Sequence, residues 1–118
     1  MNSLNGLQRF EEAKTLVRKI FPVARRVLGK SHELTLRASY NYAEALYKDP
    51  AATLDDLREA VTTLEDAGRI ARRVFGGEHP FTEEIGGELR KSRVVLAARE
   101  GDVESLREAV AAMTARDA

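Results

Sequence analysis

The sequence predicts an all-α fold of antiparallel helix pairs stacked side by side, and two observations carry this prediction. The stretch from Val23 to Thr35 returns 47 residues later as Ile70 to Thr82, with seven of thirteen positions identical. Self-similarity at a fixed period of about 20 to 50 residues is typical of stacked repeat proteins. Apolar residues also recur at helical spacing, and no long segment alternates with the period of two expected for a strand. We therefore expect about five helices in a single domain over residues 1–118.

The first helix is expected over residues 7–28, where the apolar positions form one stripe at helical spacing. Gly29 follows as a stop signal, because glycine accepts the left-handed conformation that often ends a helix. Pro22 lies inside the segment, where a proline removes a hydrogen bond and clashes with the preceding turn, at a cost of about 3 kcal/mol. We expect a kink or a break near Phe21.

A helix pair is expected over residues 34–75, with its first helix at 34–48 and its second at 54–75. Thr53 precedes the second helix, where its hydroxyl can cap the first turn while Asp56 supplies the carboxylate of a capping box. Residues 54–75 carry the clearest amphipathic pattern of the chain, which predicts one face buried against neighbouring helices.

A second helix pair is expected over residues 80–115. Pro80 opens its first helix, over 80–100, at a position that tolerates proline. Gly86-Gly87 weakens this helix by roughly 1 kcal/mol per glycine relative to alanine. We expect these two glycines to mark the close approach of a neighbouring helix. A short last helix follows over 102–115.

The composition excludes several classes of function. The chain has no Cys, which removes disulfides, thiolate nucleophiles and most structural zinc sites. Its net charge is +0, whereas a dedicated nucleic-acid binder needs a concentrated basic surface, so we expect no nucleic-acid partner. Residues 1–48 nevertheless carry nine Lys and Arg against four Asp and Glu, and residues 49–118 carry ten against fifteen. This polarity can steer a partner, favour head-to-tail contact between unlike ends, or only reflect how solvated faces are distributed.

Neither a membrane segment nor a targeting segment is visible in the sequence. The longest uncharged apolar stretches, such as residues 94–98, are far shorter than the roughly 20 residues of a membrane helix. The first residues lack both the basic and the apolar regions of a secretory signal. We therefore expect a cytoplasmic protein that does not bind membranes.

Candidate catalytic and ligand-binding residues are few. His32 and His79 occupy equivalent turns one repeat apart, so we expect each ring to cap or pack on its own turn rather than share a metal or acid–base site. The Arg-Arg pairs at 25–26 and 72–73 can contact phosphates, but cations equally suit a helix C-terminus. No Gly-rich phosphate loop accompanies them. We expect no catalytic residue, no metal site and no cofactor.

The repeated segments also follow a recognisable order of motifs. Glu-Glu-Ala at 11–13 lies in a helix that ends in Leu-Gly at 28–29. A His-x-x-Thr turn at 32–35 and Asn-Tyr-Ala at 41–43 follow it. This order resembles the tetratricopeptide repeats of the kinesin light chain type, over about residues 8–112. The resemblance implies a right-handed α-solenoid, in which residues 7–28 are the trailing helix of one repeat and the two helix pairs follow it.

In that family the leading helices of the repeats line a concave face on which a partner peptide lies. Carried onto this chain, the resemblance implies a binding face formed by Arg37, Tyr40, Asn41, Glu44, Glu84, Glu88 and Lys91, with Lys48 and Arg90 at its margins. Asparagine suits this role because its amide both donates to and accepts from a peptide backbone. The same residues also fit ordinary solvated helix surface. The expected function is a non-catalytic module that binds a protein or peptide ligand.

The alternative function is structural. An array of repeats exposes part of an apolar stripe at each end unless polar helices cap it. The first helix, with Phe10, Val17 and Phe21, lacks such a cap. The alternatives are therefore a homodimer that buries the first helix, or an accessory helical region of a larger protein.

Overall fold

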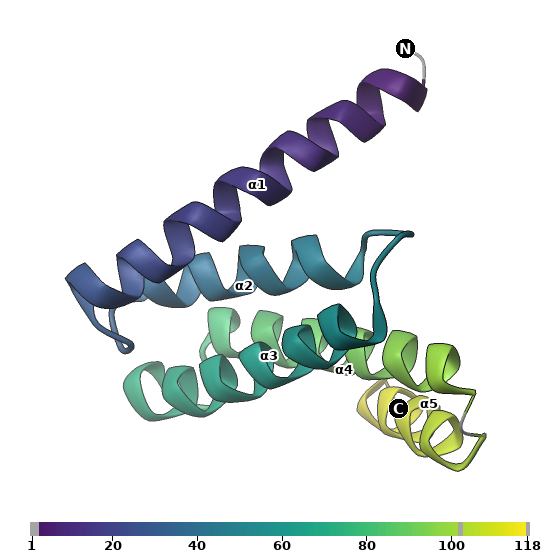
Figure 1. Cartoon of the computed structure of the whole chain (residues 1–118). Coiled ribbons are helices and arrows are strands. Elements are labelled where there is room, and N and C mark those ends of the chain that lie inside the picture. Colours follow the sequence, from purple (N-terminus) through teal and green to yellow (C-terminus); the bar gives the residue numbers. More distant parts are fainter. Residues whose placement is uncertain (1–2, 102, 118) are drawn as a thin grey trace.

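The computed structural model describes residues 3–101 and 103–117, which fold into five α-helices without any strand (Figure 1). The helices are α1 (Ser3–Leu28), α2 (Glu33–Tyr47), α3 (Leu54–Phe75), α4 (Pro80–Glu100) and α5 (Val103–Asp117). Each helix packs against the next one, and α2 also contacts α4. The predicted all-α stack of helix pairs is confirmed. Residue 102, which was expected in the last helix, lies outside the described residues.

The core lies along α3, which packs against both α2 and α4. Leu57, Ala60 and Leu64 face inward from α3 and have 0% of their surface exposed. Leu36 on α2 and Ile85 on α4 are buried with them. This is the continuous apolar seam that a repeat stack requires, since each helix pair buries its apolar face against its neighbours. None of the helices described is long and apolar enough to cross a membrane.

The two histidines cap the first helices of the two pairs. His32 Nδ1 accepts a hydrogen bond from the backbone N–H of Leu34 at 3.1 Å, and His79 Nδ1 accepts one from Phe81 at 3.1 Å. The His79 ring also stacks on Phe75, with 4.8 Å between the ring centroids. Each imidazole therefore satisfies an otherwise unpaired donor of a first turn. The expected capping role of both histidines is confirmed.

Local signals also fix the ends of α3 and the end of α1. Thr53 and Asp56 form the predicted capping box, with the Thr53 hydroxyl 3.1 Å from the Asp56 N–H and the Asp56 carboxylate 3.2 Å from the Thr53 N–H. Gly29 and Gly76 end α1 and α3 at φ values of 88° and 96°. Glycine adopts this region without the steric penalty that a Cβ brings.

Pro22 does not break the first helix. α1 is one continuous helix that contains Pro22, so the break that was one of the two expected outcomes is absent. Pro22 is exposed, and the carbonyl that it leaves without an N–H partner can therefore be hydrated. Contacts with α2 also hold the helix on both sides of the proline. The Phe21 and Tyr42 ring centroids are 5.1 Å apart, and the Thr35 hydroxyl donates to the Ala24 carbonyl at 3.2 Å.

The glycine pair in α4 does not mark a helix contact. A Cβ on Gly86 or Gly87 would meet the guanidinium of Arg90, at 3.5 and 3.7 Å, and no atom of another helix within 4 Å. The expectation of a close helix approach there is wrong, because helical side chains lean toward the N-terminus and Arg90 occupies that space. Close packing occurs instead at Gly68 of α3, where a Cβ would lie 3.6 Å from Ile85 Cγ2.

The exposed apolar surface of α1 also differs from the expected one. Val17 and Phe21 are half-buried, and the side chain of Phe10 lies outside the described residues. The side that faces solvent carries a second apolar stripe, at a spacing of four, three and four. It consists of Leu16, Ile20, Val23 and Val27, which are 56%, 47%, 46% and 68% exposed. We refer to these four residues as the α1 stripe. On the helical wheel it lies next to the half-buried Val17 and Phe21, so the single apolar stripe expected from the sequence covers two sides of the helix.

Candidate functional site

The predicted binding residues come together where α2 and α4 lie in contact. We refer to this surface as the α2–α4 face. From α2 it includes the side chains of Arg37, Tyr40, Asn41 and Glu44, together with Lys48, which caps the helix. From α4 it includes those of Glu84, Glu88 and Lys91. Contacts that join the helices include the hydrogen bond that the Tyr40 hydroxyl donates to Glu88 at 3.0 Å. The Arg37 guanidinium also lies 4.5 Å from the centre of the Phe81 ring.

Glu88 is buried, contrary to the expectation that it lies exposed on this face. Only 5% of its surface is accessible. It follows Ile85 by three residues, which places both on the side of α4 that faces α2 and α3. A buried carboxylate needs hydrogen-bond donors, and the hydroxyls of Tyr40 and Tyr47 supply two of them. Glu88 therefore holds α2 and α4 together beneath the face and is not itself exposed to a ligand.

The environment of Glu88 shifts its proton affinity. Burial disfavours the charged form and raises the pKa of the Glu88 carboxyl, although the hydrogen bond from Tyr40 acts in the opposite direction. Lys48 Nζ and Lys91 Nζ lie 3.8 and 4.0 Å from Glu88 Oε1. Burial and the Glu88 carboxylate raise the pKa of Tyr40 well above its usual value, so this phenol stays a hydrogen-bond donor.

The remaining predicted residues are accessible. Arg37, Asn41, Glu84 and Lys91 are exposed, while Glu44 is half-buried and accepts a hydrogen bond from Lys48 at 2.9 Å. Within the part of the chain that the structure describes, Asn41 and Glu84 make no hydrogen bond or ion pair. Arg37 combines an ion pair to Glu33 at 3.5 Å with its position over Phe81. The face thus presents the polar side chains of Asn41 and Glu84, which have no partner among the described residues, beside the buried and hydrogen-bonded Glu88.

The sequence interpretation missed a hollow on another side of α2. A cavity of about 380 Å³ lies among α1, α2 and α3, and none of the predicted site residues lines it. Arg25 and Arg73 line it, yet their sequence positions were equally consistent with helix C-termini. Residues Thr35 and Ser39, four apart on α2, give no sign in the sequence that they face a hollow.

No cluster of metal ligands stands out in the ranges 3–101 and 103–117, where no three His, Asp or Glu side chains gather in a way that could hold a metal ion. Both imidazoles are occupied as helix caps.

Comparison with known proteins identifies a repeat. Residues 2–33 match the family model described as Tetratricopeptide repeat, a range that takes in α1 and the turn that leads into α2. The match does not name the kinesin light chain type, which stays a prediction. No curated protein and no solved structure matches the chain.

Proposed function

We propose that the chain, whose residues 2–33 match the Tetratricopeptide repeat family, is a non-catalytic repeat module that binds a segment of a protein partner on the α2–α4 face. Repeats of this kind act in general as protein-interaction surfaces, because stacking leaves an extended face of side chains that do not take part in the core. The proposal assigns the partner segment to the face built by Arg37, Asn41, Glu84 and Lys91.

One observation carries the assignment: the buried Glu88 joins α2 to α4 directly beside these exposed groups. Its hydrogen bonds from Tyr40 and Tyr47 span both helices, so their relative position is set before a ligand arrives. A preorganised face binds more tightly, because less conformational freedom is lost on association.

The exposed groups have complementary roles in this proposal. The Asn41 amide can donate to and accept from the backbone of an extended peptide. Arg37, whose guanidinium packs over the Phe81 ring, can donate hydrogen bonds to acidic side chains of the partner. Glu84 offers a carboxylate to basic ones.

A random peptide library displayed on phage and selected on the wild-type chain tests this function. The double variant Arg37→Ala, Asn41→Ala should retain the wild-type melting temperature, since both side chains are exposed. It should bind the peptides assigned to this face about tenfold more weakly. Arg107→Ala, an exposed substitution on α5, serves as the matched control. Undiminished binding of every selected peptide by the double variant would show that the face is not used.

A second candidate function is self-association through the α1 stripe. The positions 47 residues after Leu16, Ile20 and Val23 are Thr63, Ala67 and Ile70 on α3. These three line the hollow together with residues of α2, so in the second copy of the repeat this side of the helix faces another helix. On α1 the same side is apolar and exposed. Light scattering over a range of concentrations tests the homodimer, and a monomer throughout would exclude it.

A further inference from the structure

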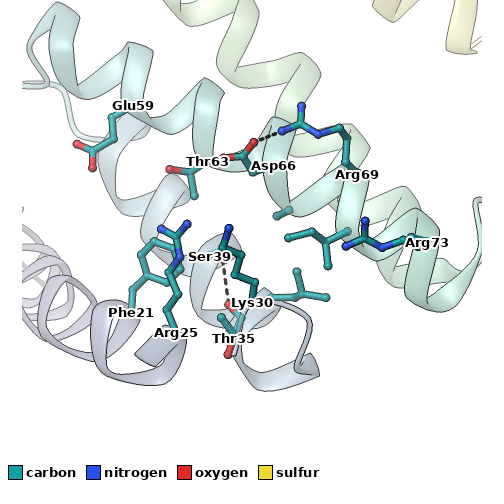
Figure 2. A pocket seen from close by; sticks show the side chains of 13 residues that line it. Phe21, Arg25, Lys30, Thr35, Ser39, Glu59, Thr63, Asp66, Arg69 and Arg73 are labelled. Atoms are coloured by element: carbon teal, nitrogen blue, oxygen red, sulfur yellow. Dashed lines mark hydrogen bonds and ion pairs between the residues drawn. The ribbon is translucent and has the colours of Figure 1, made fainter. Parts of the chain in front are cut away.

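A groove runs between α1 and α3 on a different side of α2 from the α2–α4 face. Its closed part is the cavity of about 380 Å³ shown in Figure 2. A more open hollow of about 480 Å³ shares Phe21, Arg25 and Glu59 with that cavity, so the two adjoin. We refer to both together as the α1–α3 groove. Successive helical residues lie 100° apart, which places Thr35 and Ser39 of this groove away from Arg37 and Asn41 on α2. A ligand in the groove therefore leaves the other face accessible.

The floor of the groove is apolar. Phe21 comes from α1, Leu36 from α2, and Ala67 and Ile70 from α3. Leu36 and Ala67 are only 1% and 2% exposed, so the floor is continuous with the core. The Thr35 and Ser39 hydroxyls that also line the groove already donate to backbone carbonyls, at 3.2 and 3.0 Å. The floor is therefore suited to an apolar side chain.

Cations surround this floor. Figure 2 shows Arg25 and Lys30 pointing into the space from one side and Arg73 from the opposite side. Arg25, Lys30 and Arg73 have no ion pair or hydrogen bond to any other described side chain. They come from α1, from the turn after it and from α3, so three separate segments converge on one space.

The acidic residues of the groove do not neutralise these cations. Glu59 accepts a hydrogen bond from the Tyr42 hydroxyl at 2.5 Å. Burial, together with this hydrogen bond, raises the pKa of Tyr42 to about 12. Asp66 pairs with Arg69 of its own helix. The closed part of the groove therefore holds four cations against two carboxylates. Arg25, Lys30 and Arg73 are the three cations that form no ion pair with the described residues.

We propose that the α1–α3 groove binds an acidic segment of a partner protein, with carboxylates between Arg25, Lys30 and Arg73 and an apolar side chain on Phe21 and Ile70. Guanidinium groups hold carboxylates through two parallel hydrogen bonds, which gives direction as well as attraction. In a partly enclosed hollow these charges are screened less by solvent than on an open surface. A peptide that alternates acidic and apolar side chains matches both the cations around the groove and its apolar floor.

The charge pattern favours a protein segment over a nucleic acid. A phosphate backbone presents closely spaced negative charges and needs a continuous basic track. Glu59 and Asp66 interrupt such a track within the groove. A sugar–phosphate chain has little apolar surface to bury on the floor of the groove. A Leu or Phe side chain of a peptide would bury apolar surface there.

The test uses a fluorescein-labelled peptide in which Asp and Glu alternate with Leu and Phe, and a twin in which Asn and Gln replace every acidic residue. Fluorescence anisotropy should show binding of the acidic peptide by the wild-type chain. That affinity should fall as the salt concentration rises, and the neutral twin should bind at least about tenfold more weakly. Equal binding of the twin, or no binding of the acidic peptide, would overturn the proposal.

Variants locate the site. Arg25→Gln with Arg73→Gln should weaken binding of the acidic peptide about tenfold or more, whereas Arg107→Gln on α5 should not change it. Both groove arginines are exposed, so circular dichroism melting should match the wild type. Arg37→Ala with Asn41→Ala should leave this peptide bound, which separates failure of the groove from failure of the α2–α4 face.

Two further outcomes would assign the groove to another occupant and overturn the proposal. The first is a single-stranded RNA oligomer of equal charge that binds as tightly as the acidic peptide. The second is a wild-type dimer that dissociates on Arg25→Gln with Arg73→Gln in the absence of peptide, because the groove would then hold a second copy of the chain.

Discussion

The Tyr47 hydroxyl donates a hydrogen bond to the buried carboxylate of Glu88, 41 residues away. Both side chains are almost fully buried, at 5% exposed surface each. The contact links α2, the first helix of one pair, to α4, the first helix of the next. It therefore ties the two repeats together through polar atoms beside the apolar core.

Removal of this hydroxyl should cost more than removal of a comparable exposed one. Tyr47→Phe leaves Glu88 buried with one donor fewer, and we expect the free energy of unfolding to fall by about 1–3 kcal/mol. Tyr42→Phe is the matched control, because its hydroxyl donates to Glu59 at an exposed site. Urea denaturation of both variants measures the difference. Equal losses would mean that Glu88 does not depend on Tyr47.

The stability of the chain should depend on pH through Glu88. Burial raises the pKa of this carboxyl in the folded state above its value in the unfolded chain. At a pH between these two pKa values, the folded state binds more protons than the unfolded state. The free energy of unfolding should therefore fall as the pH rises from the ordinary pKa of Glu to the raised one. In Glu88→Gln this part of the pH dependence should disappear. Thermal melts of wild type and variant across that range give the comparison, and parallel curves would contradict it.

Asp49 should act in the opposite direction. The hydrogen bond from Lys14 at 2.5 Å, together with one from the Ala51 N–H, lowers the pKa of the Asp49 carboxyl. This contribution to stability is complete above the ordinary pKa of Asp and is lost as the pH falls toward the lowered value. Asp49→Asn should therefore be less stable than the wild type at neutral pH, and the gap should narrow in acid. Chemical denaturation at both pH values measures the gap, and a gap that is independent of pH would refute the assignment.

The histidine caps make a prediction that separates capping from ring stacking. His79→Ala removes both, whereas His79→Asn keeps a side chain that caps well and loses only the stack on Phe75. We expect the alanine variant to lose about 1 kcal/mol of unfolding free energy through the cap, and the asparagine variant to lose less. A thermal melt of each variant decides this. An asparagine variant as unstable as the alanine one would place the whole contribution in the stack.

These residues also explain how far the sequence predicts the structure. Thr53, Pro80 and Gly29 were assigned correctly because a cap or a stop depends on side chains only a few positions away. The burial of Glu88 was not predicted, because its partner Tyr47 lies on another helix. Arg25 and Arg73 were visible as helix-end cations, but their convergence on one groove depends on how α1 and α3 pack on α2. Caps and stop signals can be predicted from the sequence because they depend on nearby residues. Which side of a helix is buried depends on how all the helices pack together.

The α1 stripe gives the prediction that distinguishes a binding module from a self-assembling one. Ile20 lies within the stripe and is 47% exposed, so Ile20→Glu should leave the monomer folded. If two chains pair through α1, a glutamate there would be buried without a partner, and the dimer should dissociate. Val103→Glu on α5, at an apolar position that is 67% exposed, is the matched control. Size-exclusion chromatography with light scattering should show a smaller mass for Ile20→Glu only. A wild-type dimer that both variants preserve would place the interface elsewhere.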